Sequence, residues 1–149
     1  MPQKGPHKSA VKRVHVKVGD IVRVVSGADK PFRVTGQAAE QAEEGKTTSS
    51  GRKIVTIEGT KWSVLEGKVV RVYPDRNRVL VQVVNMRTKH QKPTPKDRQG
   101  GIKRIEIPIE ASKLRLVSNE TRAASRMGRR VVDGRKVRFL KKTGELADK

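Results

Sequence analysis

The sequence has no cysteine, only four aromatic residues and few acidic side chains. Without cysteine there are no disulfides, no thiolate nucleophile and no thiolate metal site, and the absence weakly favours a cytosolic protein. No apolar run approaches the ~20 residues that cross a bilayer. Residues 1–17 lack the apolar stretch of a secretory signal; they are basic and acid-free, so an organellar transit peptide stays open, although Arg and Ser are not enriched.

Positive charge is what the sequence has in excess. Lys and Arg number 35 against 15 Asp and Glu, which gives a net charge of +20. A compact chain with this charge repels itself unless an anionic partner neutralises it. Nucleic acid is the common partner, because each contacted phosphate releases counterions. An anionic membrane surface is the rival, but the sequence has neither a basic amphipathic helix nor a lipidation signal.

The positive charge lies in three tracts. Residues 1–17 hold five Lys or Arg and no acid, residues 86–104 hold seven against Asp97, and residues 119–149 hold ten against four acids. Residues 31–66, in contrast, balance five basic against five acidic side chains. Few aromatic residues accompany the tracts, which argues against a base-stacking platform. We therefore expect Lys and Arg to contact the phosphates and hydroxyls of folded RNA.

Short stretches of β-branched residues with period-2 alternation predict strands. The alternation places Val70 and Val72 on one face, with the opposite face made by Val69, Arg71 and Tyr73. It likewise sets Val79, Val81 and Val83 against Leu80, Gln82 and Val84. Further strands are expected at residues 21–25 and at residues 113–117, with Leu114 beside Leu116. Residues 102–110 predict another, with Ile105, Ile107 and Ile109 on one face, although Pro108 favours an edge strand or a strand end there.

Turn signals join these strands into hairpins. The sequence PDRN at 74–77 and the Asp133-Gly134 pair each predict a hairpin turn, and residues 51–67 predict a third short hairpin. Only residues 36–45 have a helical composition, over a length that is marginal for an isolated helix. The many short strands indicate a small all-β barrel or sandwich.

The sequence predicts no catalytic and no metal site. His7, His15 and His90 are isolated and lack the spacing of metal ligands, and nothing resembles a nucleophile elbow or a catalytic triad. The carboxylates of Glu43 and Glu44 lie in a polar stretch, where solvent exposure is the simpler interpretation. We expect a protein that is not an enzyme, with no catalytic residue, metal, cofactor or small-molecule substrate.

Two long segments together resemble a known family. VKVGDIVRVVSGADK (16–30) and EGKVVRVYPDRNRVLVQVVNMRTKHQKPTPKDRQGGI (66–102) resemble the bacterial large-subunit ribosomal protein L-twenty-four family (universal uL-twenty-four), which carries the KOW motif. Gly67 matches the glycine of that motif. On its own, Gly67 would more simply indicate a turn with positive φ. The tail DGRKVRFLKKTGE (133–145) matches the family's C-terminal hairpin.

The resemblance implies an SH3-like β-barrel and a structural role in the large (50S) ribosomal subunit. The family binds 23S rRNA near its 5′ end, is similar to an assembly initiator and lies at the opening of the polypeptide exit tunnel. The implied partners are 23S rRNA, neighbouring large-subunit proteins and the nascent polypeptide, with no membrane. The implied location is the ribosome in the cytoplasm.

The resemblance also implies a division of the chain. Residues 1–17 form a basic N-terminal extension, and 18–118 the KOW barrel, with an insertion at 31–66 and a projecting loop at 87–101. Residues 119–149 form a basic C-terminal hairpin and tail. The chain departs from the family in the insertion, which we expect to be a neutral hairpin beside the barrel, and at Arg129, where the family has an aromatic residue.

The residues expected to bind rRNA are basic or belong to the quoted motifs. They are Lys12, Arg13, Lys17, Gly67, Lys68, Arg71, Arg76, Arg78, Lys89, His90, Gln91, Lys92, Arg104, Arg130, Arg135, Lys136, Arg138, Lys141 and Lys142. The loop expected at the tunnel exit consists of Lys92, Pro93, Thr94, Pro95, Lys96, Asp97, Arg98, Gln99, Gly100 and Gly101.

Two other classes of function compete with a ribosomal role. A KOW-containing transcription elongation or antitermination factor usually adds an α/β domain, for which this chain has no segment of sufficient length, and lacks the KHQKP and QGGI sequences. An enzyme that acts on RNA would need an acid, base or metal cluster, which the sequence does not contain.

Overall fold

The computed structural model describes residues 14–35, 43–48, 51–93, 95 and 100–148. Over these residues the chain forms strands and two short 3-10 turns, η1 (Pro74–Arg76) and η2 (Ala111–Lys113), without an α-helix. The expected all-β, SH3-like fold is confirmed. Most of the helix expected at 36–45 lies outside the described residues, and Glu44 and Gly45 form a turn. No helix in the described part of the chain is long and apolar enough to cross a membrane.

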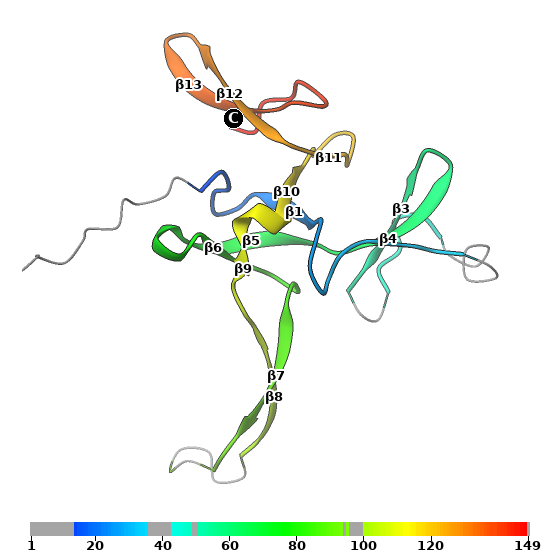
Figure 1. Ribbon diagram of the computed structural model, residues 1–149, viewed down its shortest axis with the longest axis vertical. Coiled ribbons are helices and arrows are strands. Elements are labelled where there is room, and N and C mark those ends of the chain that lie inside the picture. The colour runs from blue at the N-terminus through cyan, green and yellow to red at the C-terminus, as the bar shows by residue number, and fades with distance from the viewer. Residues whose placement is uncertain (1–13, 36–42, 49–50, 94, 96–99, 149) are drawn as a thin grey trace, which may run out of the picture.

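A six-stranded antiparallel sheet forms the barrel at the centre of the molecule (Figure 1). Its strands follow the spatial order β11 (Ala124–Ser125), β10 (Leu114–Val117), β1 (Ile21–Val24), β5 (Glu66–Tyr73), β6 (Arg78–Val81) and β9 (Ile109–Glu110). η1 and Asn77, whose φ is 51°, connect β5 to β6 as the PDRN turn predicts.

Three β-structures project from the barrel in different directions (Figure 1). The first is a three-stranded sheet of β2 (Phe32–Arg33), β3 (Lys53–Ile57) and β4 (Thr60–Val64). The second, which we call the ribbon, pairs β7 (Met86–Gln91) with β8 (Gly101–Glu106). The third is a C-terminal hairpin of β12 (Met127–Val132) and β13 (Arg135–Leu140).

The hairpin expected at residues 51–67 and the hairpin expected at Asp133-Gly134 both have two-residue turns with positive φ. Glu58 and Gly59 have φ of 50° and 74°, and Asp133 and Gly134 have φ of 50° and 75°. Such turns match the right-handed twist of the flanking strands. The hairpin predicted within the insertion and the Asp-Gly hairpin are therefore confirmed.

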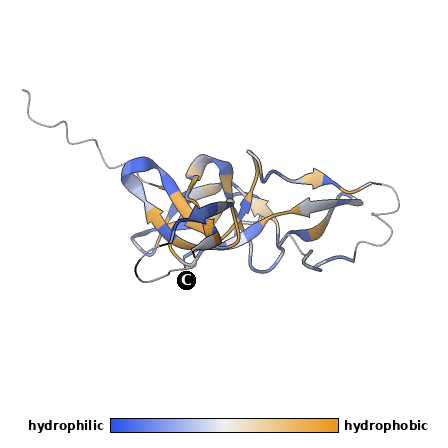
Figure 2. Ribbon diagram, turned by 90° about the horizontal axis from the view of Figure 1, so that it is seen from below, coloured by the Kyte–Doolittle hydropathy of each residue, from blue (hydrophilic) through white to orange (hydrophobic). Residues whose placement is uncertain are grey.

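The core of the barrel is small and consists largely of valine. The ribbon in Figure 2, coloured by hydropathy, shows hydrophobic residues (orange) alternating with hydrophilic ones along the strands. The cluster contains Val16, Val22, Val24, Leu65, Val69, Val79, Val81, Val84, Ala111 and Leu114. Valine suits this position because a β-branched side chain packs well on a pleated surface. Leu116 is buried like Leu114, as the sequence predicts.

Two predicted strand faces are wrong for the same kind of reason. A β-bulge between Val69 and Arg71 inserts a residue, so that Val69 is buried, Val72 packs on the core, and Val70 is 50% exposed. After β6, Val83 has a φ of 64°, which turns its side chain outward and sends Val84 into the core. Local twist at a bulge or a left-handed residue is not visible in an alternating sequence.

The strand predicted at 102–110 is divided in two. β8 ends at Glu106, and β9 begins at Ile109, after Pro108. Ile105 is 39% exposed on the ribbon, whereas Ile109 packs against the core. The three isoleucines therefore do not share one face, because the proline separates the ribbon from the barrel.

A buried ion pair joins β1 to β5. Arg23 is 5% exposed and Glu66 is 9% exposed. Nε and Nη2 of Arg23 lie 2.8 and 2.6 Å from Oε1 of Glu66, and Nη2 also donates to the carbonyl oxygen of Arg122 at 2.8 Å. The two residues are directly paired across the strands. Glu66 thus belongs to the barrel, although it ends the segment that the sequence marks as an insertion.

Candidate RNA-binding surface

The two faces of the ribbon differ in charge. Directly paired residues of antiparallel strands share a face, and successive residues alternate between faces. The register from Met86–Glu106 to Gln91–Gly101 places Arg87, Lys89 and Lys103 on one face, together with Gln91 and Ile105. The other face carries Met86, Thr88, His90, Ile102, Arg104 and Glu106. We call the set Arg87, Lys89 and Lys103 the cationic ribbon face.

The cationic ribbon face brings basic side chains close together. Lys89 is directly opposite Lys103. Arg87 and Lys89 are both exposed, and the ribbon has no core of its own. A phosphate backbone that lies along this face would be within reach of Arg87 and Lys89.

The expected site residues of the ribbon are divided between these faces. Lys89 and Gln91 lie on the cationic face, and His90 and Arg104 lie on the opposite one. Residues 87–91 and 101 of the segment expected as a loop (87–101) are paired strand, since backbone hydrogen bonding makes strands even where no side chain is buried. Lys92, Pro93 and Pro95 are exposed near its tip.

The two glycines at the tip allow the chain to return into β8. Gly100 and Gly101 have φ of 60° and 147°, and a Cβ on Gly100 would lie 2.6 Å from the Gln91 carbonyl oxygen. Lys12, Arg13, Thr94, Lys96, Asp97, Arg98 and Gln99, which were also expected to contribute, lie outside the described residues.

Gly67 has a packing role that differs from the simplest expectation. Its φ is not positive. A Cβ at this position would lie 2.1 Å from the Gln82 carbonyl oxygen and 2.7 Å from Cγ1 of Val81. The glycine therefore permits close contact between β5 and the end of β6. The basic residues that accompany it, Lys68, Arg71, Arg76 and Arg78, are exposed.

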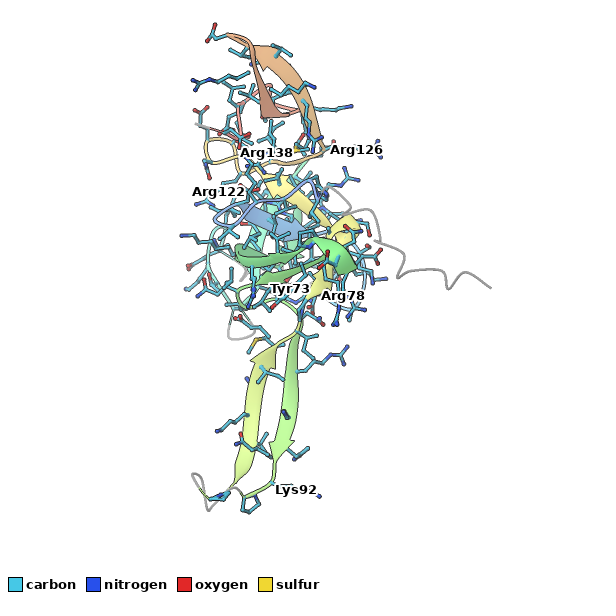
Figure 3. The ribbon with its side chains drawn as sticks, turned by 90° about the vertical axis from the view of Figure 1, so that its left-hand side faces the viewer. Tyr73, Arg78, Lys92, Arg122, Arg126 and Arg138 are labelled. Carbon is cyan, nitrogen blue, oxygen red and sulfur yellow. The ribbon has the colours of Figure 1, made fainter. Side chains whose placement is uncertain are left out.

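A cleft lies where the ribbon meets the barrel, and we call it the junction cleft. Its volume is about 570 Å³, and Arg76, Arg78, Arg87 and Lys113 line it. None of these four cations forms an ion pair with another described residue. Figure 3 shows Arg78 at the end of the barrel from which the ribbon extends, with Lys92 near the far end of the ribbon.

Sequence reasoning missed Arg87 and Lys113 as site residues. Arg87 is in the basic tract 86–104, so composition hinted at it. Lys113 is on η2, far along the chain from Arg76 and Arg78. Only the fold brings it to the cleft, where its Cδ lies 3.6 Å from the position of a Cβ on Gly27.

The C-terminal hairpin presents a second basic region on the opposite side of the barrel (Figure 3). Arg130, Arg135, Lys136, Lys141 and Lys142 are exposed there. Arg130 lies over the ring of Phe139, with its Cζ 5.4 Å from the ring centroid. The hairpin and the ribbon are separated by the barrel, so the predicted residues do not form one continuous site.

Arg138 requires a correction to the expected site. It is 7% exposed. Its Nη1 lies 2.6 Å and its Nη2 3.1 Å from the carboxylate of Asp20, and its Nε lies 2.9 Å from Oδ1 of Asp148. Nη1 also donates to the His15 carbonyl oxygen at 3.3 Å. A guanidinium with these partners holds the hairpin to the barrel and has no free donor face for phosphate.

The ion pairs between Arg138, Asp20 and Asp148 shift the pKa values of Arg138 and Asp148. Burial alone would lower the pKa of Arg138, but the hydrogen bonds to Asp20 and Asp148 outweigh it and raise that pKa. The hydrogen bond from Arg138 lowers the pKa of Asp148 well below its usual range, against the opposing effect of burial. Lys17 also pairs with Asp148, at 2.8 Å, although its side chain is 62% exposed. The positive charge of Lys17 is therefore partly neutralised by Asp148 within the protein.

Comparison with known proteins decides the family. The model of the large ribosomal subunit protein uL24 C-terminal domain matches residues 84–147. The uL24 protein of Microcystis aeruginosa is 37% identical over 138 residues, which is 92% of this chain and 90% of the relative.

The chain belongs to the uL24 family.

Other uL24 relatives match over a similar length. The protein of Geobacillus stearothermophilus is 36% identical over 136 residues, covering 91% of this chain and all of the relative. That of Gloeobacter violaceus is 41% identical over 138 residues, covering 92% and 90%. The matched C-terminal domain of uL24 starts at the root of the ribbon and includes both the ribbon and the C-terminal hairpin. In the described part of the chain, no three His, Asp or Glu side chains are grouped to hold a metal ion.

Proposed function

We propose that the protein binds 23S rRNA near its 5′ end and helps to begin assembly of the large ribosomal subunit. As a uL24 protein it is a structural constituent of that subunit in the cytoplasmic ribosome, and it is not an enzyme. Its further proposed partners are neighbouring ribosomal proteins. The tip of the ribbon would lie at the opening of the exit tunnel, close to the nascent polypeptide.

One observation carries the proposal of RNA binding. Four cations that form no ion pair with another described residue line the junction cleft, and one of them, Arg87, also begins the cationic ribbon face. The cleft, which Asp29 and Glu110 also line, therefore joins this face at Arg87 and gives a largely basic surface from the barrel onto the ribbon. Phosphates are the natural ligands of such a surface, and their binding would release counterions.

The remaining parts of the chain have different proposed roles. The exposed basic side chains of the C-terminal hairpin would contact rRNA on the other side of the barrel. The neutral insertion would face a neighbouring protein. We propose to keep the division into residues 1–17, 18–118 and 119–149, with the insertion shortened to residues 31–64 because Leu65 and Glu66 are part of the barrel.

The proposal is tested by measuring how salt affects binding to a transcript of the 5′ segment of 23S rRNA. Replacing Arg87 and Lys89 by Ala removes two charges from the cationic ribbon face. We expect the slope of log K against log salt concentration to decrease by roughly 1.4–1.8, because each phosphate contact contributes about 0.7–0.9.

Arg33→Ala is the control, since Arg33 is an exposed cation on β2 of the insertion and is not among the residues expected to bind rRNA. This variant should leave the slope unchanged. Equal slopes for the wild-type protein and the Arg87/Lys89 variant would show that the cationic ribbon face does not bind the RNA. Absence of salt-dependent binding by the wild-type protein would contradict the proposed function as a whole.

A further inference from the structure

The junction cleft combines basic side chains with a short apolar segment in its lining. Ile107, Pro108 and Ile109 are half-buried along one side of it. The guanidinium and ammonium groups come from four other elements: η1, β6, β7 of the ribbon, and η2. A ligand that fills the cleft must therefore have an apolar, flat part and a strongly anionic part.

We propose that the junction cleft holds one unstacked RNA nucleotide, with its base against Ile107–Ile109 and its flanking phosphates on Arg78, Arg87 and Lys113. The inference rests on the proposed rRNA binding. It adds that the RNA segment bound at the junction cleft is an unstacked nucleotide and not a duplex. A duplex offers its phosphates at a convex surface, with its bases stacked inside. A single extruded nucleotide instead presents a base, a ribose and two phosphates together.

The size of the cleft fits this ligand. Its volume of about 570 Å³ lies within the range of roughly 300–1,000 Å³ that is usual for small-molecule sites. A phosphate group alone would leave most of that space empty. The cleft has no aromatic lining residue, so the base would contact aliphatic side chains and the guanidinium planes of arginine.

The cleft also contains hydrogen-bond acceptors for a base. The side-chain amide of Asn85 donates through Nδ2 to the Ile107 carbonyl oxygen at 2.9 Å, which leaves its Oδ1 available to accept. Glu110 is exposed and is paired in register with Arg78, yet it forms no ion pair within 4.0 Å among the described residues. Acceptors among so many cations suit the N–H groups of a base edge.

The backbone at the root of the ribbon is fixed before any ligand arrives. The N–H of Asn85 donates to Oδ2 of Asp29 at 2.9 Å, and the N–H of Val83 donates to Oε1 of Glu106 at 2.9 Å. The barrel and the ribbon are thereby held together at the cleft. A preformed cavity avoids the entropic loss of ordering its walls on binding.

The test uses guanosine 3′,5′-bisphosphate as the probe, because it carries a base with two adjacent N–H donors and both flanking phosphates. The full chain, labelled with ¹⁵N, is titrated and its amide resonances are followed. We expect saturable shifts at Gly27, Ala28, Asn85 and Ile109. The abasic ribose 3,5-bisphosphate should bind about tenfold more weakly, since it lacks the base-edge N–H groups that would donate to the acceptors of the cleft.

Variants locate the binding in the cleft. Lys113→Ala should weaken binding of the guanosine bisphosphate about tenfold, because it removes one charged hydrogen bond. Arg33→Ala is the matched control, since it removes an exposed cation of the insertion, away from the lining residues. Arg87→Ala provides a second cleft variant on an exposed side chain, and the amide spectrum of each variant reports whether it is folded.

Equal affinity for the abasic compound would overturn the inference, because the cleft would then recognise phosphate alone. Shifts confined to the Arg135–Lys136 turn, or no shifts at all, would overturn it as well. Binding of the 23S rRNA transcript by the same protein separates the two proposals. If the transcript binds and the bisphosphate leaves the cleft unperturbed, the nucleotide site is wrong and the proposed function stands. If the transcript does not bind, the proposed function fails.

Discussion

Residues 31–64 should be removable from the chain if Leu65 and Glu66 are retained. Barrel contacts close just outside this segment: the N–H of Val24 donates to the Leu65 carbonyl oxygen at 3.0 Å, and Arg23 pairs with Glu66. The buried side chains Ile54 and Val64 do not belong to the core cluster of the barrel, whereas Leu65 does. A short Gly-Ser linker in place of 31–64 should therefore leave a folded barrel.

A deletion of 31–66 should behave very differently, although it removes only two more residues. It takes away the acceptor of the two hydrogen bonds of 2.8 and 2.6 Å that Arg23 donates to Glu66. Arg23, which is 5% exposed, would keep only the Arg122 carbonyl oxygen. Removing one partner of a buried pair costs about 3–5 kcal/mol. This is a large part of the roughly 5–15 kcal/mol that stabilises a typical domain.

Urea denaturation followed by far-ultraviolet circular dichroism is the appropriate measurement. The deletions remove Trp62, the single tryptophan, so tryptophan fluorescence cannot report on them. Full-length Glu66→Ala keeps Trp62 and tests the same ion pair by fluorescence. The shorter deletion should also bind the 23S rRNA transcript within about tenfold of the wild-type affinity, which is about 1.4 kcal/mol.

Two results would refute this reasoning. If both deletions unfold at the same urea concentration, and Glu66→Ala is as stable as the wild-type protein, the Arg23–Glu66 pair does not hold β1 to β5. If the deletion of 31–64 does not fold, the insertion is an integral part of the barrel. A loss of rRNA affinity greater than tenfold in a folded deletion would show that the insertion contacts the RNA.

Two further variants test the close packing at Gly67 and the ion pairs of Asp148. Gly67→Ala places a Cβ 2.1 Å from the Gln82 carbonyl oxygen, and overpacking of this kind should destabilise the protein by about 1–3 kcal/mol; an unchanged melting temperature would contradict it. The pKa of Asp148 is lowered in the folded state, so its stabilisation is complete above the unfolded pKa of ~3.9 and declines as pH falls through the folded pKa. Asp148→Asn should therefore be less stable at neutral pH and should lose less stability than the wild-type protein between pH 7 and pH 2, which thermal melts at stepped pH would show.

Local signals were sufficient for the hairpins. The Asp133-Gly134 pair and Glu58-Gly59 adopt the positive φ that a two-residue hairpin turn requires, and residue type alone indicates such turns. The PDRN turn is equally local. The quoted resemblance then supplied the SH3-like barrel and the ribosomal family, which composition and periodicity could only narrow to a small β-protein that binds nucleic acid.

The roles of individual basic residues could not be obtained in the same way. Arg138 and Asp20 are 118 residues apart in the chain, and only the docked hairpin shows that they form an ion pair. Lys113 in the junction cleft is a comparable case, because the cleft is assembled from four separate segments. A count of positive charges locates a basic tract, but it does not show which of its side chains form ion pairs within the protein.

The alternation of apolar residues failed where the backbone departs from a regular strand. The bulge at Val70 and the left-handed conformation of Val83 each reverse which side chain faces the core. The ribbon was missed as paired structure for a different reason: its side chains are nearly all exposed, so no apolar pattern marked it. Its backbone hydrogen bonds alone define it.

The attachment of the ribbon at a single narrow root has a mechanical consequence. Six residue pairs at about 3.4 Å per residue make an arm of roughly 20 Å. A rotation of about 10° at the root would then displace the tip by 3–4 Å, which is close to the spacing of one residue along a strand. The hydrogen bond from Asn85 to Asp29 lies at the root of the ribbon. A side chain in the loop after β1 thus helps to fix the orientation of the ribbon and the position of its tip.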